Sequence, residues 1–328
     1  MRLSGMKRMS SVCAMGLVVG VPGLLGGRWA GASGPEAVKA RPVEIDSGKV
    51  LGVLSADGKV IAYKGIPYAM PPLEDLRWRP PQLVGRWKHV LFAGDFGPHC
   101  IQFLSTPDIV FHDPGPSEDC LTLNVWAPAD ARPVKKVGGL PVMVRIYGDG
   151  FAAGGTSESR EDGGAQARSG VVVVSMNYRL GVLGFMTHPE LTAESPSHAS
   201  GNYGLMDQTA AMAWVRRNAA EFGGDPANVT ISGEPAGSIS VSLQMASPLA
   251  KGLFAKAIGE GGGSSAGGRQ LEPRERSEQA TVAWAERAFG SSKLFYLRSL
   301  TTDDLTRASG GLSWGPVIDG YFLPDSGR

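Results

Sequence analysis

The sequence predicts an α/β fold in which an N-terminal antiparallel meander precedes a central, mostly parallel sheet. Apolar, β-branched runs of strand length alternate with helical patterns through the middle of the chain. Near its beginning, short alternating runs are separated by the turn dipeptides Ser47-Gly48 and Asp57-Gly58. With 328 residues, 42% of them hydrophobic, the chain is long enough to bury the core of such a fold.

The elements follow in order along the chain. The meander is expected at residues 43–45, 49–54 and 60–64, before a proline-rich connector at 67–87. Continuous apolar runs typical of strands buried on both faces lie at 121–126, 141–147 and 171–178. A helix at 209–220, short strands at 229–231 and 254–258, and an amphipathic helix at 272–289 come next. Strands that alternate with helices indicate a parallel sheet with right-handed crossovers.

The first thirty or so residues are typical of an export signal. Arg2, Lys7 and Arg8 give a positive start, residues 12–25 are mostly apolar, and residues 30–32 form an A-x-A cleavage site. The apolar run is short for a membrane span, which favours cleavage over an uncleaved anchor. We therefore expect a signal peptide at 1–32, one domain at 33–328, a secreted or periplasmic location, and no membrane association after cleavage.

Charge and cysteine content exclude several classes of partner. The chain carries 32 basic and 31 acidic residues, so no broad basic surface for nucleic acid is expected. Cys100 and Cys120 are the pair left after cleavage and lack partner ligands at zinc spacing, so no metal is expected. In an oxidising compartment a bridge between them would contribute roughly 3 kcal/mol, and two free buried thiols are the alternative.

Residues 228–237, NVTISGEPAG, have the frame of a sharp strand–turn–helix bend. A short strand enters the turn and a helix leaves it. Gly233 and Gly237, two residues before and two after the centre, allow the backbone to fold sharply, and Pro235 occupies the centre.

Further motifs, in a fixed order, make the chain similar to the type-B carboxylesterases, the cholinesterase-like branch of the α/β-hydrolase fold. The similarity runs from about Gly48 to Pro324. The motifs that carry it are YKGIPYA (63–69), EDCLTLNV (118–125), NYRLG (177–181), GNYGLMDQ (201–208), FGGDP (222–226) and GPVIDG (315–320). The resemblance also pairs Cys100 with Cys120.

In that family the sharp bend reads Gly-Glu-Ser-Ala-Gly, so the resemblance places Pro235 on the position of the nucleophilic serine, next to Glu234. Proline has no hydroxyl and cannot attack a carbonyl. Elbow nucleophiles of the family usually have positive φ, whereas proline is fixed near −65°. The expected result is a turn without a nucleophile and with a changed backbone.

The resemblance places the oxyanion hole on residues 147–151, YGDGF, where the family has three glycines before phenylalanine. The N–H groups of Asp149, Gly150 and Ala236 would face the developing negative oxygen. A carboxylate at Asp149 would oppose that charge, and a Cβ there would strain a glycine backbone. Arg145 stands where the family usually has an aromatic residue, and a buried unpaired arginine would be costly.

The family's triad runs serine, then an acid, then histidine, but all five histidines here precede Pro235. The resemblance therefore indicates that the C-terminal part of the fold, with the acid and the histidine, is missing from this chain. It assigns a structural role to Asp207 and a tuning role to Glu234. A formal G-x-S-x-G at residues 263–267 is interpreted as a flexible loop, and Ser238 and Ser240 as ordinary helix residues.

The resemblance implies ancestral hydrolysis of a small-molecule carboxylic ester through an acyl-enzyme, with no cofactor and no metal. The chain as written is expected to lack that turnover. Two alternatives stay open: a non-catalytic binding or adhesion module, and a non-functional truncated gene product. Missing C-terminal strands argue against the module, because they would leave a sheet edge and a core face uncovered.

Overall fold

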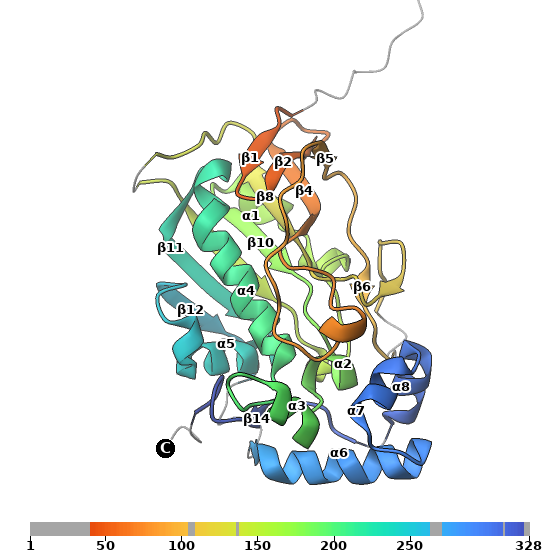
Figure 1. Cartoon of the computed structure of the whole chain (residues 1–328). Helices are drawn as coiled ribbons and strands as arrows, with labels where there is room; N and C mark the ends of the chain where they lie inside the picture. The colour runs from red at the N-terminus through yellow and green to blue at the C-terminus, as the bar shows by residue number, and fades with distance from the viewer. Residues whose placement is uncertain (1–39, 104–108, 136–137, 263–270, 311, 325–328) are drawn as a thin grey trace, which may run out of the picture. The chain divides into compact units, whose positions relative to one another are not determined.

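The structure is a computed structural model that describes residues 40–103, 109–135, 138–262, 271–310 and 312–324. Its centre is a seven-stranded mixed sheet with the order β12-β11-β9-β10-β8-β4-β3 (Figure 1). The strands are β3 (Val53–Leu54), β4 (Val60–Pro67), β8 (Thr122–Pro128), β9 (Leu140–Ile146), β10 (Val172–Met176), β11 (Gly224–Gly233) and β12 (Lys256–Gly259). The predicted α/β fold is confirmed.

The sheet is parallel in one half and antiparallel in the other. β9, β10, β11 and β12 pair in parallel, whereas β8, β4 and β3 add antiparallel pairs. Parallel neighbours need long crossover connections, and helices lie in the chain between β9 and β10, β10 and β11, and β11 and β12. The predicted parallel sheet thus corresponds to the half that these helical connections build.

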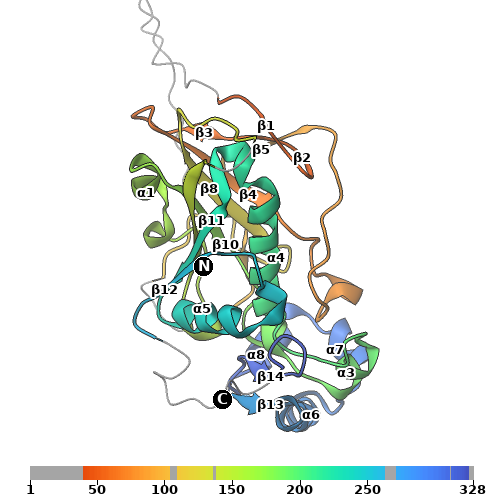
Figure 2. The ribbon, with the colours of Figure 1, turned by 90° about the vertical axis from the view of Figure 1, so that its left-hand side faces the viewer.

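Helices cover both faces of this sheet. α4 (Tyr203–Asn218) and α5 (Ala236–Ala246) pack against β9, β10, β11 and β12, and α1 (Gly164–Arg168) packs against β8 and β10. Figure 2 shows α1 on one side of the strands and α4 on the other. β10 is buried along its whole length, as its continuous run of apolar residues predicts.

The N-terminal strands divide between two sheets instead of forming one meander. β1 (Val43–Ile45) and β2 (Gly48–Leu51) form a small sheet with β5 (Val90–Phe92), while β3 joins the central sheet beside β4. The separation falls at Gly52, where a Cβ would lie 2.6 Å from the carbonyl oxygen of Ala62. The predicted antiparallel pairs β1–β2 and β3–β4 are present, but the run 49–54 is broken between them.

Helix α4 begins at Tyr203, six residues before the predicted start at Thr209, and Gly204 lies in its first turn. A Cβ at Gly204 would overlap the carbonyl oxygen of Arg179 and lie 2.8 Å from the ring of Phe185. The glycine lets the first turn of the helix approach this backbone closely, at a cost in helix propensity of about 1 kcal/mol.

Helices after β12 form a cluster at the other end of the sheet from β1 and β2 (Figure 1). α6 ends at Gly290, which has a φ of 70°, as the sequence predicts. Trp284 of α6 lies edge-on to Trp314 with ring centroids 5.0 Å apart. The α-helices here are α6 (Arg274–Phe289), α7 (Leu294–Ser299) and α8 (Thr302–Ala308).

Short elements complete the described part of the chain. The remaining α-helices and strands are α2 (Gly181–Phe185), α3 (Pro189–Glu194), β6 (His99–Cys100), β7 (Pro116–Ser117), β13 (Glu272–Pro273) and β14 (Val317–Ile318). The 3-10 turns are η1 (Glu74–Leu76), η2 (Asp149–Phe151), η3 (Ser159–Glu161), η4 (Ala219–Phe222) and η5 (Pro248–Ala250).

Strand β12 is an open edge of the central sheet. All four of its residues are exposed, and within the described residues it pairs with β11 alone. Two large apolar side chains are exposed in this region, Ile258 of β12 and Met245 of α5, which packs on β12.

Two buried ion pairs tie loops to the core. Nε and Nη2 of Arg179 donate to the two carboxylate oxygens of Asp207 at 2.8 and 2.7 Å, and both side chains are almost fully buried. Nε and Nη2 of Arg77 bond the two carboxylate oxygens of Glu118 at 2.7 and 2.6 Å. The structural role predicted for Asp207 agrees with this geometry.

The capping histidine of α3 is expected to make stability depend on pH. Nδ1 of His188 accepts the N–H of Glu190 at 3.1 Å, and the ring is buried. Burial lowers the pKa of His188, although Glu190 and Glu278 act in the opposite direction. The unfolded state therefore binds the proton more tightly, and stability is lost as the pH falls through about 6.5.

Thermal unfolding of His188→Asn at pH 7.5 and 5.5 checks this expectation. Asparagine keeps a cap acceptor but does not titrate, so its melting temperature should fall less on acidification than that of the unmodified chain. His89→Asn, at an exposed position, should fall as much as the unmodified chain. Equal falls in the unmodified chain and in His188→Asn would contradict the expectation.

Candidate active site

The predicted bend is present where β11 ends and α5 begins. Pro235 has φ −73° and ψ −37°, and its carbonyl oxygen accepts the N–H of Ile239 at 3.2 Å. The residue therefore belongs to the first turn of the helix, a position that suits proline because no N–H is needed there. The φ at the centre of the bend is negative, as proline requires.

The two flanking glycines are required by close packing. A Cβ on Gly233 would overlap the backbone of Gly237, and a Cβ on Gly237 would overlap the carbonyl oxygen of Ile146. The bend thus keeps its tight geometry around Pro235. Both Glu234 and Pro235 are exposed at its tip.

Replacing Gly237 with alanine is expected to lower the free energy of unfolding by about 1–3 kcal/mol, because the added methyl overlaps fixed backbone. Chemical denaturation followed by circular dichroism measures the change. Gly85→Ala is the control: a Cβ at Gly85 meets nothing within 4 Å. A Gly237→Ala variant as stable as Gly85→Ala would show that the bend is looser than described.

The oxyanion-type loop lies directly against the bend. A Cβ on Gly148 would overlap the carbonyl oxygen of Glu234 and lie 2.7 Å from Cδ of Pro235. Asp149, Gly150 and Phe151 follow with φ of 64°, 69° and 63°. Left-handed backbone costs a non-glycine residue roughly 1–2 kcal/mol. The strain predicted for Asp149 is therefore present, and Phe151 shares it.

A cluster of charges surrounds this loop. Asp149 forms an ion pair with Arg160 of η3, and Nε of Arg160 lies 2.9 Å from Glu158. Nη2 of Arg145 donates to the carbonyl oxygen of Arg160 at 3.0 Å, and its Nε lies 3.6 Å from Glu161. The cost expected for an unpaired Arg145 does not arise, because this arginine is partly exposed and paired.

Two carboxyl groups of the cluster have raised pKa values. Burial raises the pKa of Glu161, against the lowering effect of Arg145 and Arg160. Burial likewise raises the pKa of Glu158, against Arg160. Glu158, Arg160 and Glu161 were not predicted as part of the site, although the sequence shows four charged residues within 158–162, shortly after Gly154-Gly155.

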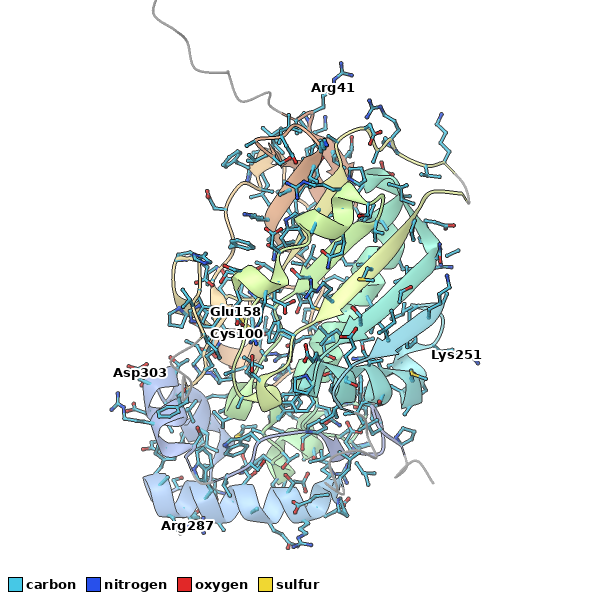
Figure 3. The ribbon with its side chains drawn as sticks, turned by 180° about the vertical axis from the view of Figure 1, so that it is seen from behind. Arg41, Cys100, Glu158, Lys251, Arg287 and Asp303 are labelled. Atoms are coloured by element: carbon cyan, nitrogen blue, oxygen red, sulfur yellow. A yellow bond between two sulfur atoms is a disulfide. The ribbon has the colours of Figure 1, made fainter. Side chains whose placement is uncertain are left out.

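Cys100 and Cys120 form a disulfide, as the resemblance implies. Figure 3 labels Cys100 and Glu158 on the same side of the molecule; Gln102 connects their segments by donating to the carbonyl oxygens of Cys100 and Gly154. Ala236 is buried in the first turn of α5. Residues 1–32 and 263–267 lie outside the described residues.

The serines near the bend are engaged elsewhere. The Oγ of Ser238 donates to the carbonyl oxygen of Gly262, and the Oγ of Ser240 accepts from Gln208 at 3.1 Å. Both are buried helix residues. The interpretation of these two serines as ordinary helix residues fits these contacts.

Three histidines have polar partners away from Pro235. Nδ1 of His99 lies 2.9 Å from Asp113, Nε2 of His112 lies 3.1 Å from Ser159, and His188 caps α3. Among the described residues, no group of three His, Cys, Asp or Glu side chains is placed to hold a metal ion. None of the helices in the described ranges is long and apolar enough to cross a membrane.

Comparison with known proteins supports the same assignment. The chain matches the model of the carboxylesterase family over residues 39–328. It is 41% identical to fumonisin B1 esterase of Sphingopyxis macrogoltabida over 285 residues, which cover 84% of this chain and 50% of that protein. It is 40% identical to para-nitrobenzyl esterase of Bacillus subtilis (strain 168), covering 85% of this chain and 56% of that protein.

A solved structure gives the same result. A PNB esterase structure superposes with a TM-score of 0.77 at 37% identity, covering 87% of this chain and 58% of that one. The chain spans about half the length of the relatives it matches. From its motifs, its fold, its bend between β11 and α5 and these matches, the chain belongs to the carboxylesterase family, with an α/β-hydrolase fold.

Proposed function

We propose that this chain is a carboxylesterase-family protein that does not hydrolyse esters by a serine acyl-enzyme route, and in that sense a pseudoenzyme. One observation carries the proposal. Pro235 occupies the centre of a bend whose flanking glycines are kept, so the position that presents the family's nucleophile offers neither a hydroxyl nor a thiol.

The neighbouring loop supports the proposal. An oxyanion hole works by directing fixed positive dipoles at a developing negative oxygen. Asp149 brings a carboxylate into this loop, and Arg160 binds that carboxylate from the side of η3. A fixed negative charge thus lies in the loop whose N–H groups would have to stabilise a negative oxygen, and it opposes that task.

The ancestral reaction was the hydrolysis of a small-molecule carboxylic ester. Similar proteins named fumonisin B1 esterase and para-nitrobenzyl esterase support an ester as the substrate class. The proposal needs no cofactor, no metal and no nucleic-acid or membrane partner. The disulfide Cys100–Cys120 supports export to an oxidising compartment through the signal peptide at 1–32.

A direct assay tests the proposal. The purified chain is incubated with 4-nitrophenyl esters of short acids, and release of nitrophenol over many turnovers is compared with that of the denatured chain. Equal steady-state rates are expected. Multiple turnovers that a serine-directed inhibitor abolishes would refute the proposal.

Pro235→Ser in this chain is expected to leave the steady-state rate of ester hydrolysis unchanged. The three histidines with polar partners, His99, His112 and His188, bond other groups, so none of them is placed to take the proton of the new hydroxyl. The Pro235→Ser and Pro235→Ala variants are compared in the same assay. A rate in the serine variant well above that of the alanine variant would show that a working base is already in place.

The second candidate is a non-catalytic binding or adhesion module. The observation that favours it is structural: the core of the described residues is closely packed and carries a disulfide and two buried ion pairs. A cooperative thermal transition of the isolated chain would support this candidate. A molten or aggregated state would instead indicate a chain without function.

A further inference from the structure

A serine–histidine pair lies on the surface close to the charge cluster. Oγ of Ser159, on η3, lies 3.1 Å from Nε2 of His112. Both side chains are exposed. The distance is that of a hydrogen bond between a hydroxyl nucleophile and its base. Ser159 is adjacent in sequence to Arg160, which holds Asp149.

The two segments that carry this pair are fixed to each other by other contacts. The N–H of His112 donates to Oγ of Ser157 at 3.3 Å, and Oγ of Ser157 donates to Oδ2 of Asp113. Oδ1 of Asp113 lies 2.9 Å from Nδ1 of His99, a buried ring. The position of His112 relative to Ser159 therefore does not depend on their own hydrogen bond.

The chemistry of the two neighbouring serines differs. Ser157 is buried, and its hydroxyl is used by Asp113, so it has neither access nor a free base. Ser159 is open to solvent and bonds an imidazole. The adjacent Arg160 is neutralised by Asp149 and Glu158, which leaves His112 as the group that accepts the serine proton.

We propose that Ser159 is a nucleophile toward activated carboxylic esters, with His112 as its general base. The Oγ of Ser159 attacks the carbonyl carbon, and its proton passes to Nε2 of His112. The bond from the acyl carbon to the leaving oxygen breaks, a nitrophenolate departs, and an ester of Ser159 remains. His112 then loses its extra proton to water.

This step is stoichiometric. The product is an alkyl ester of serine, whose leaving group is far poorer than nitrophenolate, so one acyl group accumulates per chain. The site is separate from Pro235, and it stands whether or not the proposed function holds. Acylation without repeated turnover is compatible with that function, and the position of the acyl group distinguishes the two.

Acyl mapping tests the proposal. The chain is treated with 4-nitrophenyl acetate at pH 7.5 and digested with trypsin, and fragment masses locate the acetyl group. Ser159 should be acetylated about 100-fold faster than Ser299, an exposed serine without an imidazole partner, which is the modest end of general-base catalysis.

Matched variants make the result decisive. Ser159→Ala should abolish the fast release of one nitrophenolate per chain, and His112→Gln should reduce it to the rate of Ser299. Ser299→Ala and His89→Gln should change neither, and circular dichroism confirms that each variant is folded. Fast release that survives Ser159→Ala, an acetyl group on Ser299 at an equal rate, or acetylation of Ser159 unaffected by His112→Gln would overturn the proposal.

Discussion

Replacing Asp207 with alanine is expected to lower the free energy of unfolding by about 3–5 kcal/mol, among the largest effects of a single change in this chain. The change leaves the guanidinium of Arg179 buried without its counter-charge. Asp207 accepts three hydrogen bonds from Arg179, from its backbone N–H, Nε and Nη2, and the change removes all three. Equilibrium denaturation in urea, followed by tryptophan fluorescence, measures the effect.

Two further variants separate the buried charge from the loss of contacts. Asp303→Ala removes a carboxylate on α8 that is exposed and lies 3.7 Å from Arg307, and it should leave the urea midpoint nearly unchanged. The double change Arg179→Met with Asp207→Leu should cost less than Asp207→Ala alone, because no unpaired charge remains. A double variant less stable than the single one would show that the ion pair itself stabilises the fold.

Removing the disulfide by replacing Cys100 and Cys120 with alanine is expected to destabilise the fold by about 3 kcal/mol. The bridge joins residues separated by 20 positions, and the chain-entropy model gives this value for a loop of that size. Both cysteines are buried, so the small alanine side chains add a packing loss. The midpoint of urea unfolding should shift to lower concentration in both the double variant and the reduced chain.

The reduced chain also serves as the control for this prediction. It keeps both sulfur atoms in the core and loses the cross-link alone, so its stability isolates the loop entropy from the packing loss. If reduction left the urea midpoint unchanged, the bridge would contribute nothing to the stability of the fold.

The strands and the bend could be predicted because their signals are local. The apolar run that became β10 is buried on both faces, and Gly290 ends α6 in the left-handed conformation that the sequence implies. The division of the first strands at Gly52 could not be predicted, since it depends on how closely β4 approaches in space. The close approach of Gly204 to the backbone of Arg179 could not be predicted for the same reason, because the two residues are distant in sequence.

At the site, the backbone could be predicted and the electrostatics could not. Proline fixes its own φ, so the negative φ at the centre of the bend followed from Pro235 alone. The partners of Arg145 and Asp149 come from η3, and the intervening loop decides which charges meet. The sequence therefore predicts a free-energy cost for an unpaired Arg145, whereas the fold supplies Glu161 and a backbone carbonyl oxygen as its partners.

Because of the open edge at β12, the tendency of this chain to self-associate and the stability of its fold depend on different residues. The residues of β12 are exposed, and within the described ranges its outer side pairs with no strand, so it can form the same ladder with another molecule, which is a route to self-association. Core contacts decide how firmly the chain folds, and they lie elsewhere. A substitution that strengthens the core would leave self-association through β12 unchanged. A charged residue in place of Ile258 would raise solubility at little cost in the free energy of folding.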